Sequence, residues 1–447
     1  MFASFLWALF LLPAAGRGEA AAPGSLAITG VTIIDVTGGA TRRGMTVVIR
    51  DGRIAEIAPG GRDTAGKGAR VVEGRGRFLI PGLWDMHVHL SWSTASALPA
   101  LVANGVTGVR DMGSRLNQID EWRTLISAGI LSGPRILRVG PILNGQKFNA
   151  YQMVPGNPDE TRGVARALKE AGVDFLKVHR RLPRESYFPL IDEARRLGLS
   201  VVGHIPMTVT PEEASDAGQA TLEHTETLFE GTFSAGLKDE DLSDAIRRFR
   251  SEAAERLFAR FVRNHTAVTP TLVPYRSYVE SLDPAFPPDP HRRYVAQSLR
   301  KEAERTSKPA YETELAQLKR TFEELREVVR EEIRSGVTVL AGTDLAGARV
   351  PGFPLHDELA LLVEAGATPL QALAAATRVP ARVVQKANEL GTIEVGKLAD
   401  LVLLDANPLE DIRNTRRISA VVLAGRFLDR RDLDALLEEA ERQASRN

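Results

Sequence analysis

Short apolar runs rich in β-branched residues recur eight times between residues 83 and 344, and helical patterns separate several of them. Such alternation is typical of βαβ units, in which helices join successive parallel strands. The helical stretches 161–172 and 326–336 end at Gly, as a helix C-terminus should. Eight repeats predict a closed (β/α)8 barrel of the TIM type. The predicted strands begin at Leu83, Val106, Arg135, Asp174, Leu199, Ala220, Ala267 and Val337.

Both ends of the chain have a different pattern, with short alternating runs broken by Gly and Asp. It covers Leu26 to Ile80 and returns over 391–429, and Asp51-Gly52 is a strong hairpin signal because Gly tolerates positive φ. We expect the two ends to pair in one small β-sandwich. The predicted units are a composite β-sandwich over 23–80 and 390–430, a barrel over 81–389, and a charged terminal helix over 431–447.

One segment of the barrel region, about 229–332, is longer than a simple crossover connection requires. It contains two charge-rich helical stretches on either side of a Pro-containing run. Long connections in compact domains often carry function, which favours a helical insertion or lid near the barrel mouth. Ordinary solvated helix without a chemical role is the alternative interpretation.

Charge and cysteine content exclude several classes of protein. Lys plus Arg and Asp plus Glu both number 57, so no field of one sign would attract a polyanion, and we expect no nucleic-acid partner. The chain has no cysteine, so disulfides, a thiolate metal site and a cysteine nucleophile are all excluded. Any metal ion must be held by nitrogen and oxygen atoms.

The first residues resemble a secretory signal peptide. Phe2 to Ala15 is an apolar run, and small residues between Ala14 and Ala22 offer a cleavage site, so we expect export with residues 1–22 removed. No Lys or Arg precedes the run, and a plain N-terminal extension is the alternative. No later segment offers about 18 uninterrupted apolar residues, so the mature form should have no integral membrane segment.

Polar side chains stand where several predicted barrel strands end. Because active sites of such barrels lie at the carboxyl ends of the strands, these side chains should meet at one mouth. His87 and His89 are two residues apart on a strand and therefore point to the same face. The collected set offers the nitrogen and oxygen ligands that Zn²⁺ and related ions prefer. It comprises His87, His89, Lys177, His204, His224 and Asp344.

With these residues in place, the chain resembles the amidohydrolase superfamily, in particular the branch of imidazolonepropionase and the Xaa-Pro, Xaa-Arg and Xaa-Lys dipeptidases. The resemblance rests on PGLWDMHVHL from residue 81, on GTD at 342–344, and on the tail ATRVPARVVQKANELGTIEVGKLADLVLLDANPLEDI from residue 376. It implies that His87 and His89 hold one metal with Asp344, and that His204 and His224 hold a second.

The resemblance also implies that Lys177 bridges the two ions after carboxylation by CO₂, since an uncarboxylated cation would be repelled by them. The expected cofactor is two Zn²⁺ per chain, with Mn²⁺, Co²⁺ or Fe²⁺ as alternatives. A single metal beside an ordinary Lys177 is the competing interpretation.

The expected activity is hydrolysis of a C–N amide bond in a dipeptide, an N-acyl amino acid or a cyclic amide. A metal lowers the pKa of bound water toward ~7, which supplies hydroxide, and Asp344 is the expected proton shuttle and catalytic residue. The alternatives are a lactonase, carbamate or organophosphate hydrolase on the same site, or an exported binding protein without activity.

Substrate contacts are predicted on the segment after the fourth strand. His179 lies two residues after Lys177 and shares its strand face, and Tyr187 with Arg180 or Arg181 is a candidate for a substrate carboxylate. Solvated charge is the alternative for the two arginines. The substrate is expected to be a small molecule, and a homo-oligomer is left open.

Overall fold

The computed structural model describes residues 25–60, 69–229, 231, 242–306 and 312–446. The predicted signal peptide over 1–22 lies outside these ranges. Within them, none of the helices combines the length and apolar character needed to cross a bilayer.

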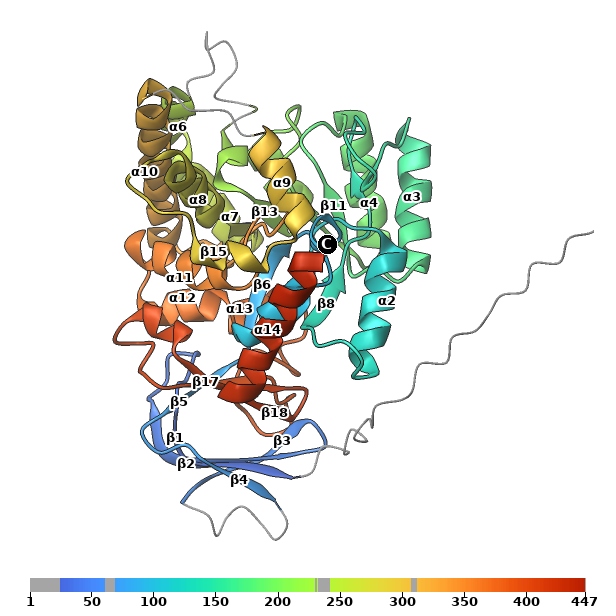
Figure 1. The fold of residues 1–447 in the computed structure, drawn as a ribbon. Helices are drawn as coiled ribbons and strands as arrows, with labels where there is room; N and C mark the ends of the chain where they lie inside the picture. Colours follow the sequence, from blue (N-terminus) through green and yellow to red (C-terminus); the bar gives the residue numbers. More distant parts are fainter. Residues whose placement is uncertain (1–24, 61–68, 230, 232–241, 307–311, 447) are drawn as a thin grey trace, which may run out of the picture.

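A closed barrel of parallel strands forms the centre of the molecule (Figure 1). Hydrogen-bonded neighbours form one run from β6 to β8 and another from β11 to β15. Two backbone hydrogen bonds join the runs: Asp174 N donates to Arg138 O at 2.8 Å, and Met86 N donates to Ala341 O at 2.9 Å. In the described residues the ring comprises β6 (Leu83–Val88), β7 (Val106–Asp111), β8 (Arg135–Arg138), β11 (Phe175–Val178), β12 (Ser200–Gly203), β13 (Thr221–Glu223), β14 (Ala267–Thr269) and β15 (Thr338–Val339).

Helices surround this barrel, as βαβ units require (Figure 1). Several begin at side-chain caps that satisfy free N–H groups, such as Asn157 before α3 and Thr210 before α5. They are α1 (Ala97–Ala103), α2 (Leu116–Ser127), α3 (Pro158–Glu170), α4 (Arg184–Leu197), α5 (Pro211–Ala217), α6 (Leu242–Glu252), α7 (Ala254–Asn264), α8 (Leu272–Leu282), α9 (Gln297–Thr306), α10 (Glu312–Arg334), α11 (Phe353–Glu364), α12 (Pro369–Ala375) and α13 (Arg378–Val383). Shorter elements are the two-residue strands β9 (Ile142–Leu143) and β10 (Gln152–Met153) and the 3-10 turns η2 (Leu90–Trp92), η3 (Thr225–Leu228), η4 (Pro290–Tyr294) and η5 (Ile412–Arg416).

Strands from both ends of the chain form one sheet below the barrel (Figure 1). The two ends meet where β16 pairs antiparallel with β5, and the predicted hairpin at Asp51-Gly52 joins β2 to β3 with positive φ at both residues. Its strands are β1 (Leu26–Ile33), β2 (Arg42–Arg50), β3 (Arg53–Pro59), β4 (Arg70–Glu73), β5 (Phe78–Pro81), β16 (Leu401–Leu404), β17 (Ile418–Leu423) and β18 (Arg426–Asp429). The predicted fold class, a (β/α)8 barrel with a β unit from both chain ends, is confirmed. The predicted domain limits stay predictions.

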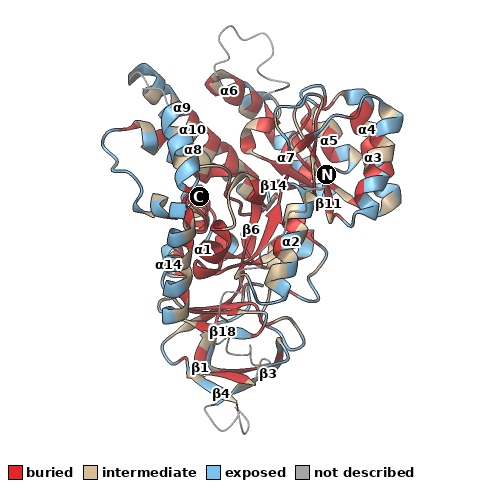
Figure 2. Ribbon diagram, turned by 45° about the vertical axis from the view of Figure 1, so that its right-hand side comes forward, coloured by how far each residue is buried: buried red, intermediate tan, exposed pale blue. Residues whose placement is uncertain are grey.

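Two of the apolar clusters match this division. One lies among the strands of the terminal β unit and includes Ile28, Val47 and Leu401, while the larger one lies between the barrel strands and their helices. Burial is concentrated in the strands (Figure 2), as expected for parallel strands covered on both faces. The helix α14 (Arg430–Arg446) runs from the β unit along the barrel in Figure 1.

The predicted seventh strand is shorter than expected. The apolar run from Ala267 continues to Tyr275, but β14 ends at Thr269, and helix α8 begins at Leu272. Pro270 has no N–H for a strand ladder, and Thr271 adopts a left-handed φ of 50°, so the chain turns there. The proposed insertion over 229–332 therefore contains helices α6 to α9 and most of α10, together with a barrel strand; residues 230, 232–241 and 307–311 of it lie outside the described ranges.

Candidate metal centre

The six predicted metal ligands come from barrel strands or from the residue or loop that follows one. His87 lies on β6 and His89 just after it, while Lys177 lies on β11. His204 and His224 directly follow β12 and β13, and Asp344 follows β15. Because all these strands are parallel, their carboxyl ends open on the same side of the barrel.

Asp344 and three of the histidines lie close together. Asp344 Oδ1 is 3.5 Å from His87 Nε2 and also 3.5 Å from His89 Nε2. Ligand atoms of His87, His224 and Asp344 lie within 4.8 Å of one another. The His224 ring is 4.6 Å from the His87 ring, so the first and the sixth barrel strands bring their histidines together here.

His204 and Lys177 lie beside this cluster. The ring centres of His204 and His224 are 4.7 Å apart. Lys177 is fully buried, and its charge lowers the pKa of all four histidines. Gly203 on the next strand is required for this arrangement, because its φ is +125° and a Cβ there would stand 2.2 Å from Val178 O and 2.8 Å from Lys177 Cδ.

Burial keeps the clustered histidines neutral. It lowers the pKa of His89 and of His224 to about 4, and it lowers the pKa of His87 and His204 well below the ordinary value. Neutral imidazole offers the lone pair that a metal ion requires, so these side chains are ready to ligate near pH 7. Although burial opposes it, Arg349 and the histidines hold the pKa of Asp344 below its ordinary value, so that carboxyl group is ionised.

Backbone strain is concentrated at the same place. His224 has a φ of 68° and Asp344 a φ of 50°, values that residues other than Gly rarely adopt. Thr271, whose Oγ1 lies 2.7 Å from His224 Nδ1, has a φ of 50°. Such strain persists where the surrounding structure holds it and is typical of functional sites.

Polar atoms without partners fit a metal at the centre of this cluster. His87 Nε2, Lys177 Nζ and His204 Nδ1 are buried and have no hydrogen-bond partner within the described part of the chain. Buried polar atoms normally have partners, so a group of unpaired nitrogen atoms is what a metal-binding site should show. Nitrogen and carboxylate oxygen atoms suit a divalent ion such as Zn²⁺. The chemistry of the donor set therefore fits the metal predicted from the sequence.

Two further contacts surround Asp344. Arg349 Nη1 contacts its carboxylate from the loop after β15. Beneath it, the buried Asp85 accepts hydrogen bonds from Thr343 N at 2.9 Å and from Thr343 Oγ1 at 2.6 Å. Burial raises the pKa of Asp85 to about 7. These contacts orient the turn that carries Asp344.

Three of the predicted substrate residues lie beside the centre or at its rim. The His179 ring is 4.1 Å from the His204 ring, and its Nδ1 is buried without a partner among the described residues. Burial lowers the pKa of His179 to about 3, and the charges of Lys177 and of the half-buried Arg180 act in the same direction. Arg181 is exposed, and its guanidinium lies 4.9 Å above the Phe148 ring. Their contact with substrate stays a prediction.

Tyr187 does not lie on the loop after the fourth strand, which corrects the predicted placement of this residue. It is part of helix α4, and its side chain is fully buried. Its hydroxyl group donates to Gln219 Oε1 at 2.8 Å. The run RESY has helix-forming neighbours, so α4 begins at Arg184, earlier than the loop assignment assumed.

Important residues of the centre were missed in the sequence. Glu223 Oε2 lies 2.8 Å from His87 Nδ1, and Arg110 binds the same carboxylate. Neighbouring strand residues normally face opposite sides, so Glu223 and His224 were not expected to serve one site. The positive φ of His224 breaks that alternation. The sequence offered one signal for this contact, namely an acidic residue directly before the histidine that follows a strand.

An aromatic stack leads outward from His89. The Trp92 ring lies 4.5 Å from the His89 ring, and the Tyr151 ring lies 5.3 Å from Trp92. The Tyr151 hydroxyl group donates to Ser91 O at 2.8 Å, which ties the loop after β9 to the loop after β6. These rings form an apolar support on one side of the histidine pair.

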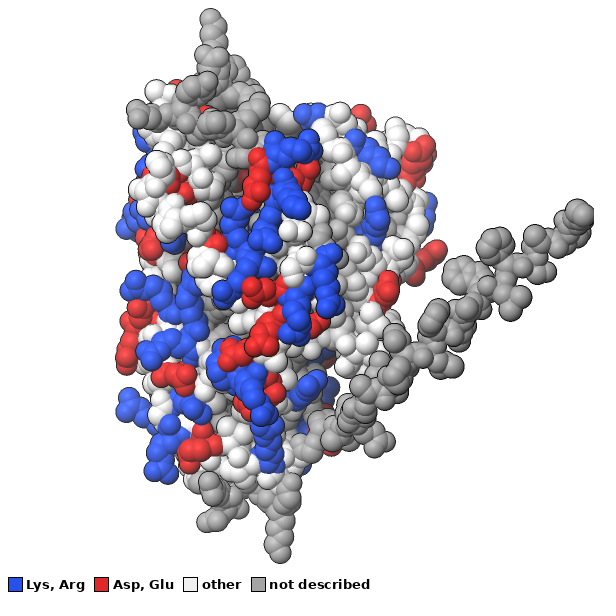
Figure 3. Space-filling model, viewed as in Figure 1, with Lys and Arg blue, Asp and Glu red and all other residues white. Residues whose placement is uncertain are grey.

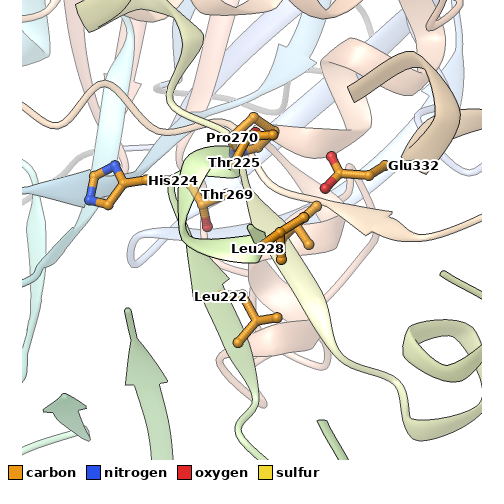
Figure 4. Close-up of a pocket in the computed structure, with 8 residues that line it drawn as sticks. Leu222, His224, Thr225, Leu228, Thr269, Pro270 and Glu332 are labelled. Atoms are coloured by element: carbon orange, nitrogen blue, oxygen red, sulfur yellow. The ribbon is translucent and has the colours of Figure 1, made fainter. Parts of the chain in front are cut away.

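A small cavity lies behind His224, between the barrel and helix α10. It is lined by Leu222, His224, Thr225, Leu228, Val268, Thr269, Pro270 and Glu332. Figure 4 shows the His224 ring on the far side of the turn from Glu332. Both carboxylate oxygens of Glu332 are buried without a partner in the described ranges. The outer surface seen in Figure 3 carries interspersed charges of both signs.

Comparison with known families gives a match over part of the chain. Residues 277–428 match the model of the amidohydrolase family. Adenine deaminase of Paracoccus denitrificans is 35% identical over 99 residues, which is 22% of this chain and 16% of the deaminase. Ochratoxinase of Aspergillus niger is 43% identical over 91 residues, covering 20% of this chain and 18% of that protein. The matched segments thus span less than a fifth of these relatives.

The comparison of structures covers nearly the whole chain. A candidate prolidase from Bifidobacterium longum has a TM-score of 0.68 and 28% sequence identity. The similarity covers 94% of this chain and 99% of the other. The barrel and its terminal β unit are therefore shared as one arrangement.

Proposed function

We propose that the chain is a metal-dependent hydrolase of the amidohydrolase family that cleaves C–N amide bonds, because residues 277–428 match the model of that family. The substrate classes are a dipeptide, an N-acyl amino acid or a cyclic amide. Similarity to proteins named prolidase and ochratoxinase supports this choice over other bonds.

The observation that carries the proposal is the group of buried nitrogen atoms without hydrogen-bond partners beside an ionised carboxylate. A binding protein has no need to keep neutral histidines and Asp344 around one point. His87 and His89 with Asp344 would hold one ion, and His204 with His224 a second. Lys177, in carboxylated form, would join the two.

A divalent metal, which we propose to be Zn²⁺, would lower the pKa of a water molecule and polarise the substrate carbonyl when bound. Asp344 moves the proton. Its carboxylate accepts a proton from the attacking water as the C–O bond forms, and it passes that proton to the amine nitrogen as the C–N bond breaks. Its lowered pKa keeps it in the accepting form at neutral pH.

The test combines metal analysis with a substrate library, in the wild type and in Asp344→Asn. We expect near two Zn²⁺ per chain and turnover of an amide, and a loss of turnover of about 10²–10⁴-fold in the variant because the proton acceptor is gone. Asp405→Asn is the matched control, since Asp405 pairs with Arg77 on the exposed β unit.

The library should include lactones, carbamates and phosphotriesters. Turnover of one of these without any amide would replace the amidase assignment with that activity. No metal binding and no turnover would leave the exported binding protein as the better description.

We also propose that the chain is exported and loses residues 1–22. The apolar run from Phe2 and the small residues up to Ala22 support this. N-terminal sequencing of the protein from its native host should give a mature start near residue 23, and an intact Met1 would reject the proposal.

A further inference from the structure

An ion pair between Arg110 and Glu223 lies inside the barrel, below the metal centre. Arg110 Nη2 is 2.7 Å from Glu223 Oε1, and both side chains are 0% exposed. They come from β7 and β13, which are far apart in the sequence. Removing two charges from water is costly, so the rest of the contacts must compensate.

The guanidinium group of Arg110 uses all of its nitrogen atoms in this position. Nε donates to Met86 O at 2.8 Å, and Nη1 donates to Thr221 Oγ1 at 3.0 Å. Nη2 also lies 3.4 Å from Thr269 Oγ1. These contacts reach β6, β13 and β14, so the planar group is held rigidly and its orientation is set by the barrel.

Both oxygen atoms of the Glu223 carboxylate have hydrogen-bond partners. Oε1 accepts from Arg110 and from Thr221 Oγ1, while Oε2 lies 2.8 Å from His87 Nδ1. The guanidinium group of Arg110 can only donate hydrogen bonds, so the Glu223 carboxylate acts as an acceptor on both of its oxygen atoms. His87 must therefore carry its proton on Nδ1. The lone pair is left on Nε2, the atom that has no partner within the described part of the chain.

We propose that Arg110 and Glu223 are positioning residues that fix the tautomer and the orientation of His87, so that Nε2 faces the metal. This inference rests on the proposed metal-dependent function. Among the described metal-centre histidines, His87 is held by a carboxylate, whereas His89 Nδ1 faces Gly113 O at 3.3 Å and His224 Nδ1 faces Thr271 Oγ1 at 2.7 Å. His87 should then be the ligand most sensitive to its support.

Glu223→Gln gives the sharpest test, because it changes one atom and reverses one hydrogen bond. The single amide oxygen of Gln would stay with Arg110, so its NH₂ group would face His87 Nδ1. His87 would then carry its proton on Nε2 and lose its metal lone pair. We expect the Zn²⁺ affinity, measured by competition with a chromophoric chelator, to fall about 10–100-fold.

Glu223→Asp tests whether the length of the side chain matters in addition to its negative charge. It keeps the negative charge beside Arg110 but shortens the side chain by one methylene, so we expect a weaker loss of Zn²⁺ affinity in the same direction. Glu193→Gln is the matched control. Glu193 lies on helix α4, is also a largely buried glutamate, and pairs with Arg166 at 2.9 Å. Its Zn²⁺ affinity should stay within twofold of the wild type.

A merely structural ion pair would give a different result. Melting temperatures would fall in the Glu223 variants, while the Zn²⁺ affinity of the folded fraction would match that of the wild type. That outcome overturns the inference, and it does so without bearing on the activity of the wild type.

The tautomer can be measured without any variant. The chain has eight histidines, so selective ¹⁵N labelling gives few ring signals. In the metal-free wild type we expect His87 to show a protonated Nδ1 and an unprotonated Nε2. The opposite tautomer would overturn the inference even if no Glu223 variant folds. If the wild type binds no Zn²⁺, the proposed function fails instead. The ring signals of the metal-free protein still report the tautomer of His87 in that case, so the two failures can be told apart.

Discussion

At the residue scale, Lys177 is the most unusual side chain of the centre. A fully buried lysine loses its hydration, and burial lowers the pKa of Lys177 to about 8 although Glu223 acts in the opposite direction. About a tenth of such amine groups are neutral at pH 7, far more than for an ordinary lysine. Only the neutral amine reacts with CO₂, so the lowered pKa would make the proposed carboxylation of Lys177 easier.

Lys177→Met should lower the metal content from near two ions per chain to near one. The variant keeps the apolar volume but removes the bridging group, so the pair His204 and His224 would bind its ion weakly. Elemental analysis measures the effect, and wild type reloaded without bicarbonate should resemble the variant. Lys397→Met serves as control, since it removes a largely buried lysine that pairs with Glu394 instead of with the metal centre. Two ions in Lys177→Met would show that the lysine does not bridge.

At the element scale, helix α10 carries an unpaired acid against the barrel. Burial raises the pKa of Glu332 to about 8, with a smaller contribution from Glu331, and both of its carboxylate oxygens lie buried beside the cavity of Figure 4. The folded state therefore holds a proton that the unfolded chain releases near the ordinary value of 4.5. The stability from this proton is present at low pH and is lost as the pH rises toward 8.

Glu332→Gln should therefore become more stable relative to the wild type as the pH rises from 5 to 9. One pKa unit corresponds to about 1.4 kcal/mol, so we expect the difference in the free energy of unfolding to grow by ~2 kcal/mol or more. Denaturant titrations at both pH values measure it. Glu323→Gln, which changes an exposed glutamate on the same helix that pairs with Arg326, should show no such growth. A constant difference across this range would mean that Glu332 is ionised in the folded protein.

At the scale of the whole molecule, helix α14 joins the two units. It packs on α1 of the barrel and also contacts β17 and β18 of the terminal β unit. Leu433, Ala440 and Ala444 are fully buried on its inner face, whereas most of its charged residues are exposed. Helix α14 thus packs against both the β unit and the barrel, and a few small or apolar side chains form the contact.

Leu433→Ala should destabilise the protein by about 2–4 kcal/mol, because it leaves a cavity at this junction. Thermal unfolding should show a lower midpoint, and Zn²⁺ affinity should be unchanged since the metal centre is remote in the fold. Val395→Ala is the control, as Val395 is 61% exposed. A wild-type midpoint in Leu433→Ala would mean that α14 contributes little to holding the units together.

Local sequence patterns were sufficient for the barrel, for the terminal β unit and for the position of the six metal-centre residues. Strand periodicity and turn residues act over a few neighbours, so they are visible without the fold. Polar residues at the ends of apolar strands could be collected because parallel strands place their carboxyl ends on one side. His87, His224 and Asp344 meet for that reason.

Only the tertiary structure decided which other side chains join the centre. Arg110 lies in an apolar strand, and its partner Glu223 is 113 residues away, so no local pattern connects them. Tyr187 is buried because α4 turns its ring toward Gln219, and Thr271 ends the seventh strand early by adopting a left-handed turn. The sequence by itself determined the elements and the ends of their strands, since those depend on near neighbours. The hydrogen bonds that orient the ligands depend on contacts between distant strands, and only the closed barrel brings those strands together.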